Sequence, residues 1–236
     1  ADSFAIARKL DMAVAFHLDD SMFWTRHPGL QQGGDHLEWT DWLGTKNTGR
    51  RIDWGPDPAR IAPQLCFNSV PVMKAVKERA ALIGREVAHE YRLLKGEGRE
   101  HLFAGVIAGW ETMLGRDFAS GRATGFCALT NKGYSHNRPP SDVDTARAEV
   151  VKDFIELWAA SVHREGVPRH LIYNHVAFTA QGLAGNKSDH PPGDTAFSDH
   201  YRPGFSTYPS PGALSEILAL LKQHRTPPWA SVEGTN

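Results

Sequence analysis

The feature that most constrains the fold of this 236-residue chain is the alternation of helical segments with short apolar runs. The spacing of apolar residues predicts helices over residues 4–10, 70–94, 141–166 and 213–223. Runs of small and β-branched residues predict buried strands over residues 12–18, 102–111, 170–176, 204–209 and 228–233. Residues 124–130 are predicted to be a further short strand or a loop. Such alternation implies parallel strands joined by right-handed crossovers.

The fold predicted from this order is an α/β fold, a (β/α)8 TIM barrel, with residues 1–236 as one complete or partial barrel domain. A closed eight-stranded barrel takes about 250 residues, and five or six predicted strands fall short of eight. The chain also opens within a helical pattern and stops just after a strand pattern, so we expect an incomplete barrel or a fragment of a longer one. The alternative is a small open α/β sheet.

Composition argues against two classes of partner. The chain has 26 basic and 27 acidic residues and a formal net charge of -1, whereas nucleic-acid binding normally needs a basic patch. It has no apolar run of 18 residues or more, so no membrane span is expected. Cys66 and Cys127 are too few for a disulfide framework and would form either one bridge or two free buried thiols.

Two glutamates end predicted strands. Glu111 closes the run over residues 102–111, and Glu233 closes the run over residues 228–233. The carboxyl end of a barrel strand is where such barrels keep their chemistry. Two carboxylates in that position, each close to a tryptophan, predict sugar chemistry.

The chain from about Leu10 to Glu233 resembles the retaining TIM-barrel glycoside hydrolases of the clan that includes β-galactosidases and cellulases. The sequence Gly-Trp-Glu over residues 109–111 lies where that clan keeps its acid/base glutamate, at the end of strand four. The sequence Trp-Ala-Ser-Val-Glu over residues 229–233 lies where the clan keeps its nucleophile, at the end of strand seven. If residues 124–130 are a loop, two predicted strands lie between the strand that ends at Glu111 and the strand that ends at Glu233. This is the number expected between strands four and seven of the barrel.

The resemblance implies a glycosidase in which Glu111 is the acid/base and Glu233 is the nucleophile, with carboxyl groups about 5–5.5 Å apart. One position departs from the clan, which usually has asparagine before the acid/base, whereas this chain has Trp110. The expected substrate is an oligosaccharide or polysaccharide, and no cofactor is expected. A secreted or periplasmic location follows from this function. A homo-oligomer or a complementing fragment would cover the exposed sheet edges of an incomplete barrel.

Further polar and aromatic residues at strand ends and in loops are candidate sugar contacts. They are His17, Asp19, Asp20, Trp24, Trp110, Asn131, Tyr134, Asn174, His175 and Tyr208. Carboxylates and imidazoles can hold sugar hydroxyls, and tryptophan faces can stack on a pyranose. The structural alternatives are a solvated acidic turn, a surface loop and core packing.

Two other functions remain open at this point. His17, Asp19, Asp20 and His175 offer nitrogen and oxygen ligands for a divalent ion, as in a deacetylase or amidohydrolase type of metal-dependent hydrolase. A non-catalytic carbohydrate-binding barrel is the third hypothesis.

Overall fold

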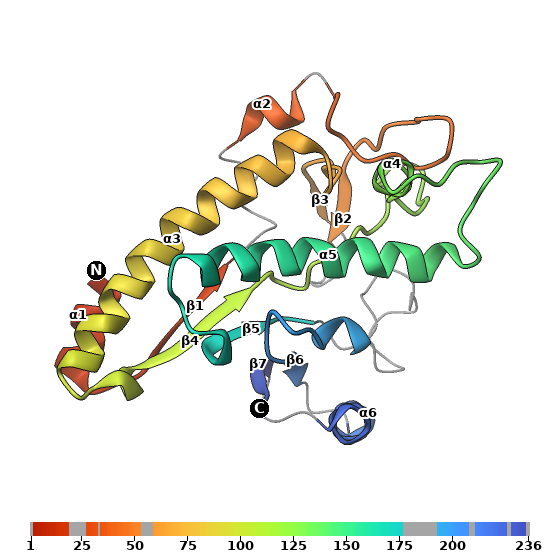
Figure 1. Ribbon diagram of the computed structural model, residues 1–236. Helices are drawn as coiled ribbons and strands as arrows, with labels where there is room; N and C mark the ends of the chain where they lie inside the picture. Colours follow the sequence, from red (N-terminus) through yellow and green to blue (C-terminus); the bar gives the residue numbers. More distant parts are fainter. Residues whose placement is uncertain are drawn as a thin grey trace.

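The computed structural model describes residues 2–18, 27–32, 34–52, 59–176, 193–207, 211–225 and 228–234 (Figure 1). The helices are α1 (Asp2–Leu10), α2 (Pro28–Gln31), α3 (Val70–Gly96), α4 (Phe126–Asn131), α5 (Val143–Arg164) and α6 (Pro211–His224). The strands are β1 (Val14–Leu18), β2 (Arg50–Ile52), β3 (Ala59–Ile61), β4 (Phe103–Ala108), β5 (Ile172–Asn174), β6 (Gly204–Thr207) and β7 (Ala230–Gly234). Short 3-10 helices are η2 (Glu100–Leu102), η3 (Arg169–Leu171) and η4 (Gly193–Ala196).

The parallel strands lie side by side in chain order. A three-stranded parallel sheet has the order β1-β4-β5, and β6 pairs in parallel with β7. Backbone hydrogen bonds link the two sheets, because Val176 N donates to Gly204 O at 3.0 Å and Ser206 N donates to Val176 O at 3.1 Å. The predicted parallel arrangement is therefore confirmed, and the carboxyl ends of these strands point the same way.

The predicted (β/α)8 barrel is wrong. The described residues form parallel sheets of three and two strands, and no strand pairing within them joins β1 to β7. A barrel needs its first and last strands to pair. Between β1 and α3, the described residues supply the antiparallel pair β2–β3, which makes a separate sheet instead of adding parallel strands.

The predicted strand or loop over residues 124–130 is instead helix α4. Gly125 begins the helix with a φ of 124°, a backbone conformation that favours glycine. The Glu38 carboxylate, which is distant in sequence, accepts hydrogen bonds from the backbone N–H groups of Cys127 and Ala128 in the first turn. These contacts satisfy backbone donors that a helix leaves unpaired at its start.

The two long helices match the predicted periodicity. In α3, Val72, Val76 and Val87 are buried, and in α5 the same is true of Phe154 and Trp158. The carboxylate of Asp142 caps α5 by accepting from Asp144 N and Thr145 N. These helices pack on each other and form the main hydrophobic core.

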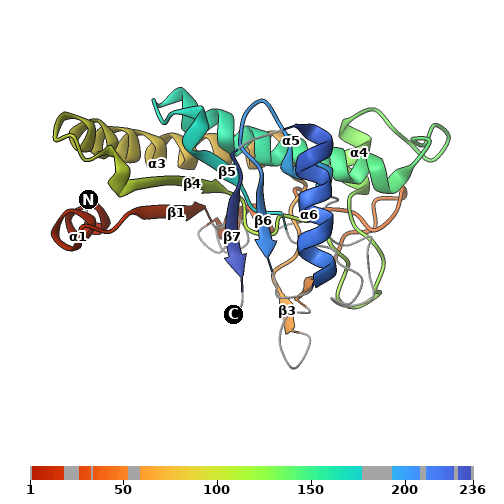
Figure 2. The ribbon, with the colours of Figure 1, turned by 90° about the horizontal axis from the view of Figure 1, so that it is seen from below.

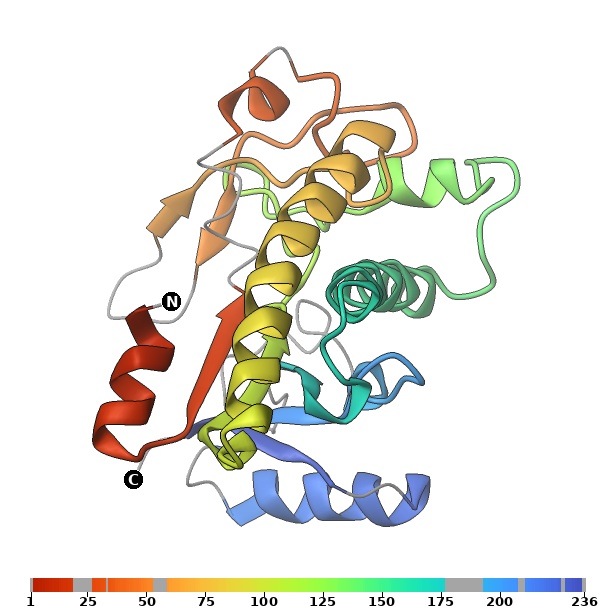
Figure 3. The same ribbon diagram turned by 60° about the vertical axis from the view of Figure 1, so that its left-hand side comes forward.

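The helices α3 and α5 cover one face of the β1-β4-β5 sheet (Figure 2). Leu18, Val106 and Ile172 point into that core and are buried. On the opposite face, His17 is exposed and Tyr173 is half-buried. Helix α6 lies beside β6, away from α3 (Figure 3), over a second small apolar cluster. No helix among the described residues is both long and apolar enough to span a membrane.

Candidate functional site

Polar side chains from four strands come together at the carboxyl ends of the parallel strands. His17 lies near the end of β1, Glu111 follows β4, and His175 directly follows β5. Ser206 lies in β6, and its register partner in β7 is Glu233. In open α/β sheets this edge is where ligands bind.

A chain of close contacts crosses this edge. His17 Nε2 lies 2.9 Å from Gly109 O and 3.1 Å from His175 Nδ1. His175 Nε2 lies 2.6 Å from Ser206 Oγ, and Ser206 Oγ lies 3.4 Å from Glu111 Oε1. Four side chains from four strand ends are thus connected.

The partners of His17 assign the proton positions in this chain. A carbonyl oxygen can only accept, so His17 Nε2 carries a proton that faces both Gly109 O and His175 Nδ1. His175 Nδ1 is then an acceptor, and its Nε2–H donates to Ser206 Oγ. The Ser206 hydroxyl is left to donate to Glu111 Oε1.

His175 is neutral in this arrangement. Burial, together with the neighbouring His17, lowers the pKa of His175 to about 3. Its ring is fully buried. A neutral ring has one donor and one acceptor nitrogen, which is what its two partners require.

Glu111 has an unusual backbone conformation, with a φ of 47°. Gly109, two residues earlier, has a φ of 82°. Left-handed backbone is uncommon for residues other than glycine, and such strain clusters at functional sites. This turn aims the half-buried Glu111 side chain at Ser206 in β6.

The remaining predicted site residues divide into three groups. Trp110 is half-buried, and its ring contacts His17 edge-on with centroids 6.1 Å apart. Glu233 has its backbone in β7, but its side chain lies outside the described residues, as do Asp19, Asp20, Trp24 and Tyr208. The separation of the Glu111 and Glu233 carboxyl groups is therefore not among the described distances.

The third group lies in structural contacts away from the His17–Ser206 chain. The buried Asn174 amide donates to Thr195 O and accepts from Gly204 N. Asn131 is the last residue of α4 and contacts Cys66 and Asn68. Tyr134 packs partly buried against the main core.

The metal-binding alternative has little support among the described residues. His17 and His175 direct one nitrogen each at the other, at 3.1 Å. The described side chains that converge as ligands are Glu38, Cys66 and Cys127, in another part of the fold. Asp19 and Asp20, the other predicted ligands, lie outside the described residues.

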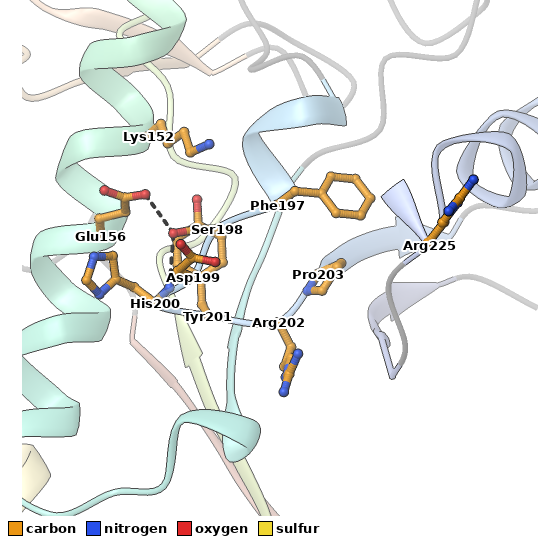
Figure 4. Close-up of a pocket in the computed structure, with 10 residues that line it drawn as sticks. All are labelled: Lys152, Glu156, Phe197, Ser198, Asp199, His200, Tyr201, Arg202, Pro203 and Arg225. Carbon is orange, nitrogen blue, oxygen red and sulfur yellow. Dashed lines mark hydrogen bonds between the residues drawn. The ribbon is translucent and has the colours of Figure 1, made fainter. Parts of the chain in front are cut away.

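A cavity of about 600 Å³ lies elsewhere, between α5, the segment 197–203 and Arg225 (Figure 4). Ser198 Oγ in its wall donates to Glu156 Oε1 at 2.6 Å. None of the predicted site residues lines it. We place the candidate site at the strand ends because polar groups from several strands contact one another there.

Ser206 is a site residue that the sequence analysis missed. It lies on the face of β6 opposite Phe205, which packs in the second apolar cluster. In the predicted strand over residues 204–209, Ser206 lies two positions before Tyr208, so the period-two pattern of a strand gives both the same parity in the sequence. That parity is the signal by which Ser206 could have been found.

A scan of the chain against protein-family models found no match, and neither did a search of curated proteins. Function is therefore argued from the site itself.

Proposed function

We propose that the protein is a glycoside hydrolase that cleaves a glycosidic bond with retention of anomeric configuration. The observation that carries the proposal is the contact between Glu111 Oε1 and Ser206 Oγ. Ser206 is the register partner of Glu233, so the carboxylate that follows β4 reaches the strand next to the one that holds the second glutamate. A pair of carboxylates at one strand edge is the requirement for glycoside hydrolysis.

The two glutamates have different roles in the proposed reaction. Glu111 gives its proton to the glycosidic oxygen as the carbon–oxygen bond breaks. Glu233 attacks the anomeric carbon and forms a covalent glycosyl-enzyme. Glu111 then takes a proton from water, whose oxygen displaces Glu233 and releases the sugar.

The neighbouring residues fit supporting roles. The chain from His17 through His175 to Ser206 delivers one hydroxyl donor to Glu111 and so fixes the direction in which its carboxylate points. Trp110, beside His17, offers an aromatic surface for the apolar face of a sugar ring.

The first experiment compares Glu111→Gln with the parent protein on a panel of aryl glycosides and polysaccharides. We expect Glu111→Gln to lower kcat/KM by about 10²–10⁴-fold, because general acid catalysis contributes that much. Glu156→Gln is the matched control, since Glu156 also accepts from a serine hydroxyl but lies in the separate cavity. Glu156→Gln should leave the activity unchanged.

Glu233 is tested by replacement with alanine and addition of azide. A glycosyl azide with inverted anomeric configuration from this variant would identify Glu233 as the nucleophile, because azide then attacks the anomeric carbon in a single displacement. NMR of the first product of the parent protein should show the retained anomer, and an inverted product from the parent would contradict the retaining mechanism. Sugar binding without turnover by the parent protein would support a carbohydrate-binding protein instead.

A further inference from the structure

Three buried residues from three separate segments converge beneath α4. Glu38 precedes β2, Cys66 precedes α3, and Cys127 lies in α4. One carboxylate oxygen and the two sulfur atoms all lie within 4.8 Å of one another. Glu38 and Cys66 are fully buried, and Cys127 is 7% exposed. Both thiols are free.

The Glu38 carboxylate is satisfied on one side. Its Oε1 accepts from Trp39 N at 3.1 Å, Cys127 N at 2.5 Å and Ala128 N at 3.1 Å. Its Oε2 is buried and has no hydrogen-bond partner among the described residues. An unpartnered buried carboxylate oxygen is costly unless a cation or a proton meets it.

Without a metal, Cys66 is a protonated thiol, because a hydrogen bond with Cys127, burial and the nearby Glu38 carboxylate raise its pKa. A zinc ion at this position would displace that proton. Asn131 Nδ2 donates to Cys66 Sγ at 3.4 Å, and such a donor stabilises negative charge on sulfur. The Cys66 thiol donates to Asn68 Oδ1 at 3.4 Å, so that oxygen already faces the sulfur. Zinc–sulfur and zinc–oxygen bonds of about 2.3 and 2.1 Å at a tetrahedral angle separate two ligands by about 3.6 Å.

We propose that Glu38, Cys66 and Cys127 bind a zinc ion, with the side-chain oxygen of Asn68 as the fourth ligand. Two thiolates favour zinc over calcium or magnesium, which prefer oxygen ligands. The ion gives Glu38 Oε2 the partner that it lacks and compensates the buried negative charges. Four protein ligands are typical of a structural zinc site. Here Glu38, Cys66 and Cys127 are buried, and Asn68 is half-buried.

The site would hold together three segments of the chain, which are the loop before β2, the loop before α3 and the start of α4. Trp39 O accepts from Gly125 N, and Leu37 pairs with Leu65, so these segments already meet beside the proposed ion. The segment from Glu111 to α4 carries the proposed acid/base residue at one end and Cys127 near the other. Zinc at this position stabilises the fold and takes no part in the hydrolysis.

The test is the metal content of the full chain, purified without metal-affinity steps. We expect one zinc per chain by mass spectrometry. Replacement by cobalt should give the charge-transfer absorption of cobalt bound to thiolates, and removal of zinc with a chelator should lower Tm. These measurements use the parent protein and do not depend on any variant folding.

Variants then identify the ligands. Glu38→Gln and Cys66→Ser should lose zinc, and Asn131→Ala should bind it about 10–100-fold more weakly because a supporting hydrogen bond is lost. Glu90→Gln is the matched control, because Glu90 is also largely buried but pairs with Arg8. It should keep one zinc per chain.

Two outcomes overturn the proposal. In the first, the parent protein binds neither zinc nor cobalt, both thiols stay free, and Glu38→Gln is as stable as the parent. Together these results would mean that the Glu38 carboxyl group is protonated and needs no metal ion. The other is a disulfide between Cys66 and Cys127. Either result leaves the glycosidase proposal untouched, because that proposal is tested through Glu111 and Glu233.

Discussion

At the scale of single residues, the Ser206 hydroxyl connects the histidine pair to the proposed acid/base. It accepts from His175 Nε2 and donates to Glu111 Oε1. Since Ser206 is fully buried, neither contact is readily replaced by bulk water. Removing this oxygen takes one hydrogen-bond partner from Glu111 and one from the buried imidazole of His175.

We therefore predict that Ser206→Ala lowers kcat/KM by about 10–100-fold, since a misdirected carboxylate loses its alignment with the glycosidic oxygen. The free energy of unfolding should fall by about 1–3 kcal/mol. Ser198→Ala is the comparison, because Ser198 makes a similar hydroxyl–carboxylate contact with Glu156. It should lose stability with unchanged kinetics, and equal kinetic losses in the two variants would refute a positioning role for Ser206.

At the scale of elements, the seam between β5 and β6 depends on close backbone approach. A Cβ added to Gly204 would overlap the carbonyl oxygen of Asn174. The Asn174 side chain also accepts from Gly204 N, so the two strand ends are locked at this point. No rotamer change can relieve a clash with backbone.

We predict that Gly204→Ala separates this seam and lowers Tm sharply or abolishes soluble expression, because the strands must move apart. Gly96→Ala is the control, since Gly96 ends α3 and an added Cβ there meets nothing within 4 Å. That change should be neutral or slightly stabilising in thermal unfolding. Similar Tm values for both variants would show that the seam tolerates repacking.

The elements also show how far the sequence could predict the fold and the site. Helical periodicity and the Asp142 cap predicted α3 and α5, because both signals are local. Helix α4 was missed because a distant carboxylate, Glu38, satisfies its first turn. The rule that strand ends carry chemistry selected His17, Glu111 and His175, which hydrogen bonds through Ser206 connect. The buried Glu38 cluster has no such rule, since its members come from segments far apart in sequence.

At the scale of the whole molecule, the predicted closure of a barrel was wrong, because closure depends on pairing between strands that no local sequence pattern encodes.

The stability of the whole chain should depend on pH because of His175. The pKa of His175 is about 3 in the folded protein and about 6.5 in the unfolded chain. Between these values the unfolded state holds a proton that the folded state does not.

We predict that this contribution is complete above about pH 6.5 and falls by about 1.4 kcal/mol per pH unit as the pH drops toward 3. Urea unfolding at several pH values should therefore give a steeper loss of stability for the parent than for His175→Gln. His101→Gln, at an exposed position, should keep the slope of the parent. Parallel curves for the parent and His175→Gln would contradict a neutral buried imidazole.

The left-handed backbone of Glu111 affects which substitutions at this position should be favoured in related sequences. Holding a residue with a Cβ in that conformation costs about 1–2 kcal/mol. Glycine or asparagine would remove most of that cost, and the half-buried position would accept either. If the proposed hydrolysis is lost in a related protein, glutamate at this position should therefore be replaced early, so its presence would mark the relatives that keep the proposed activity.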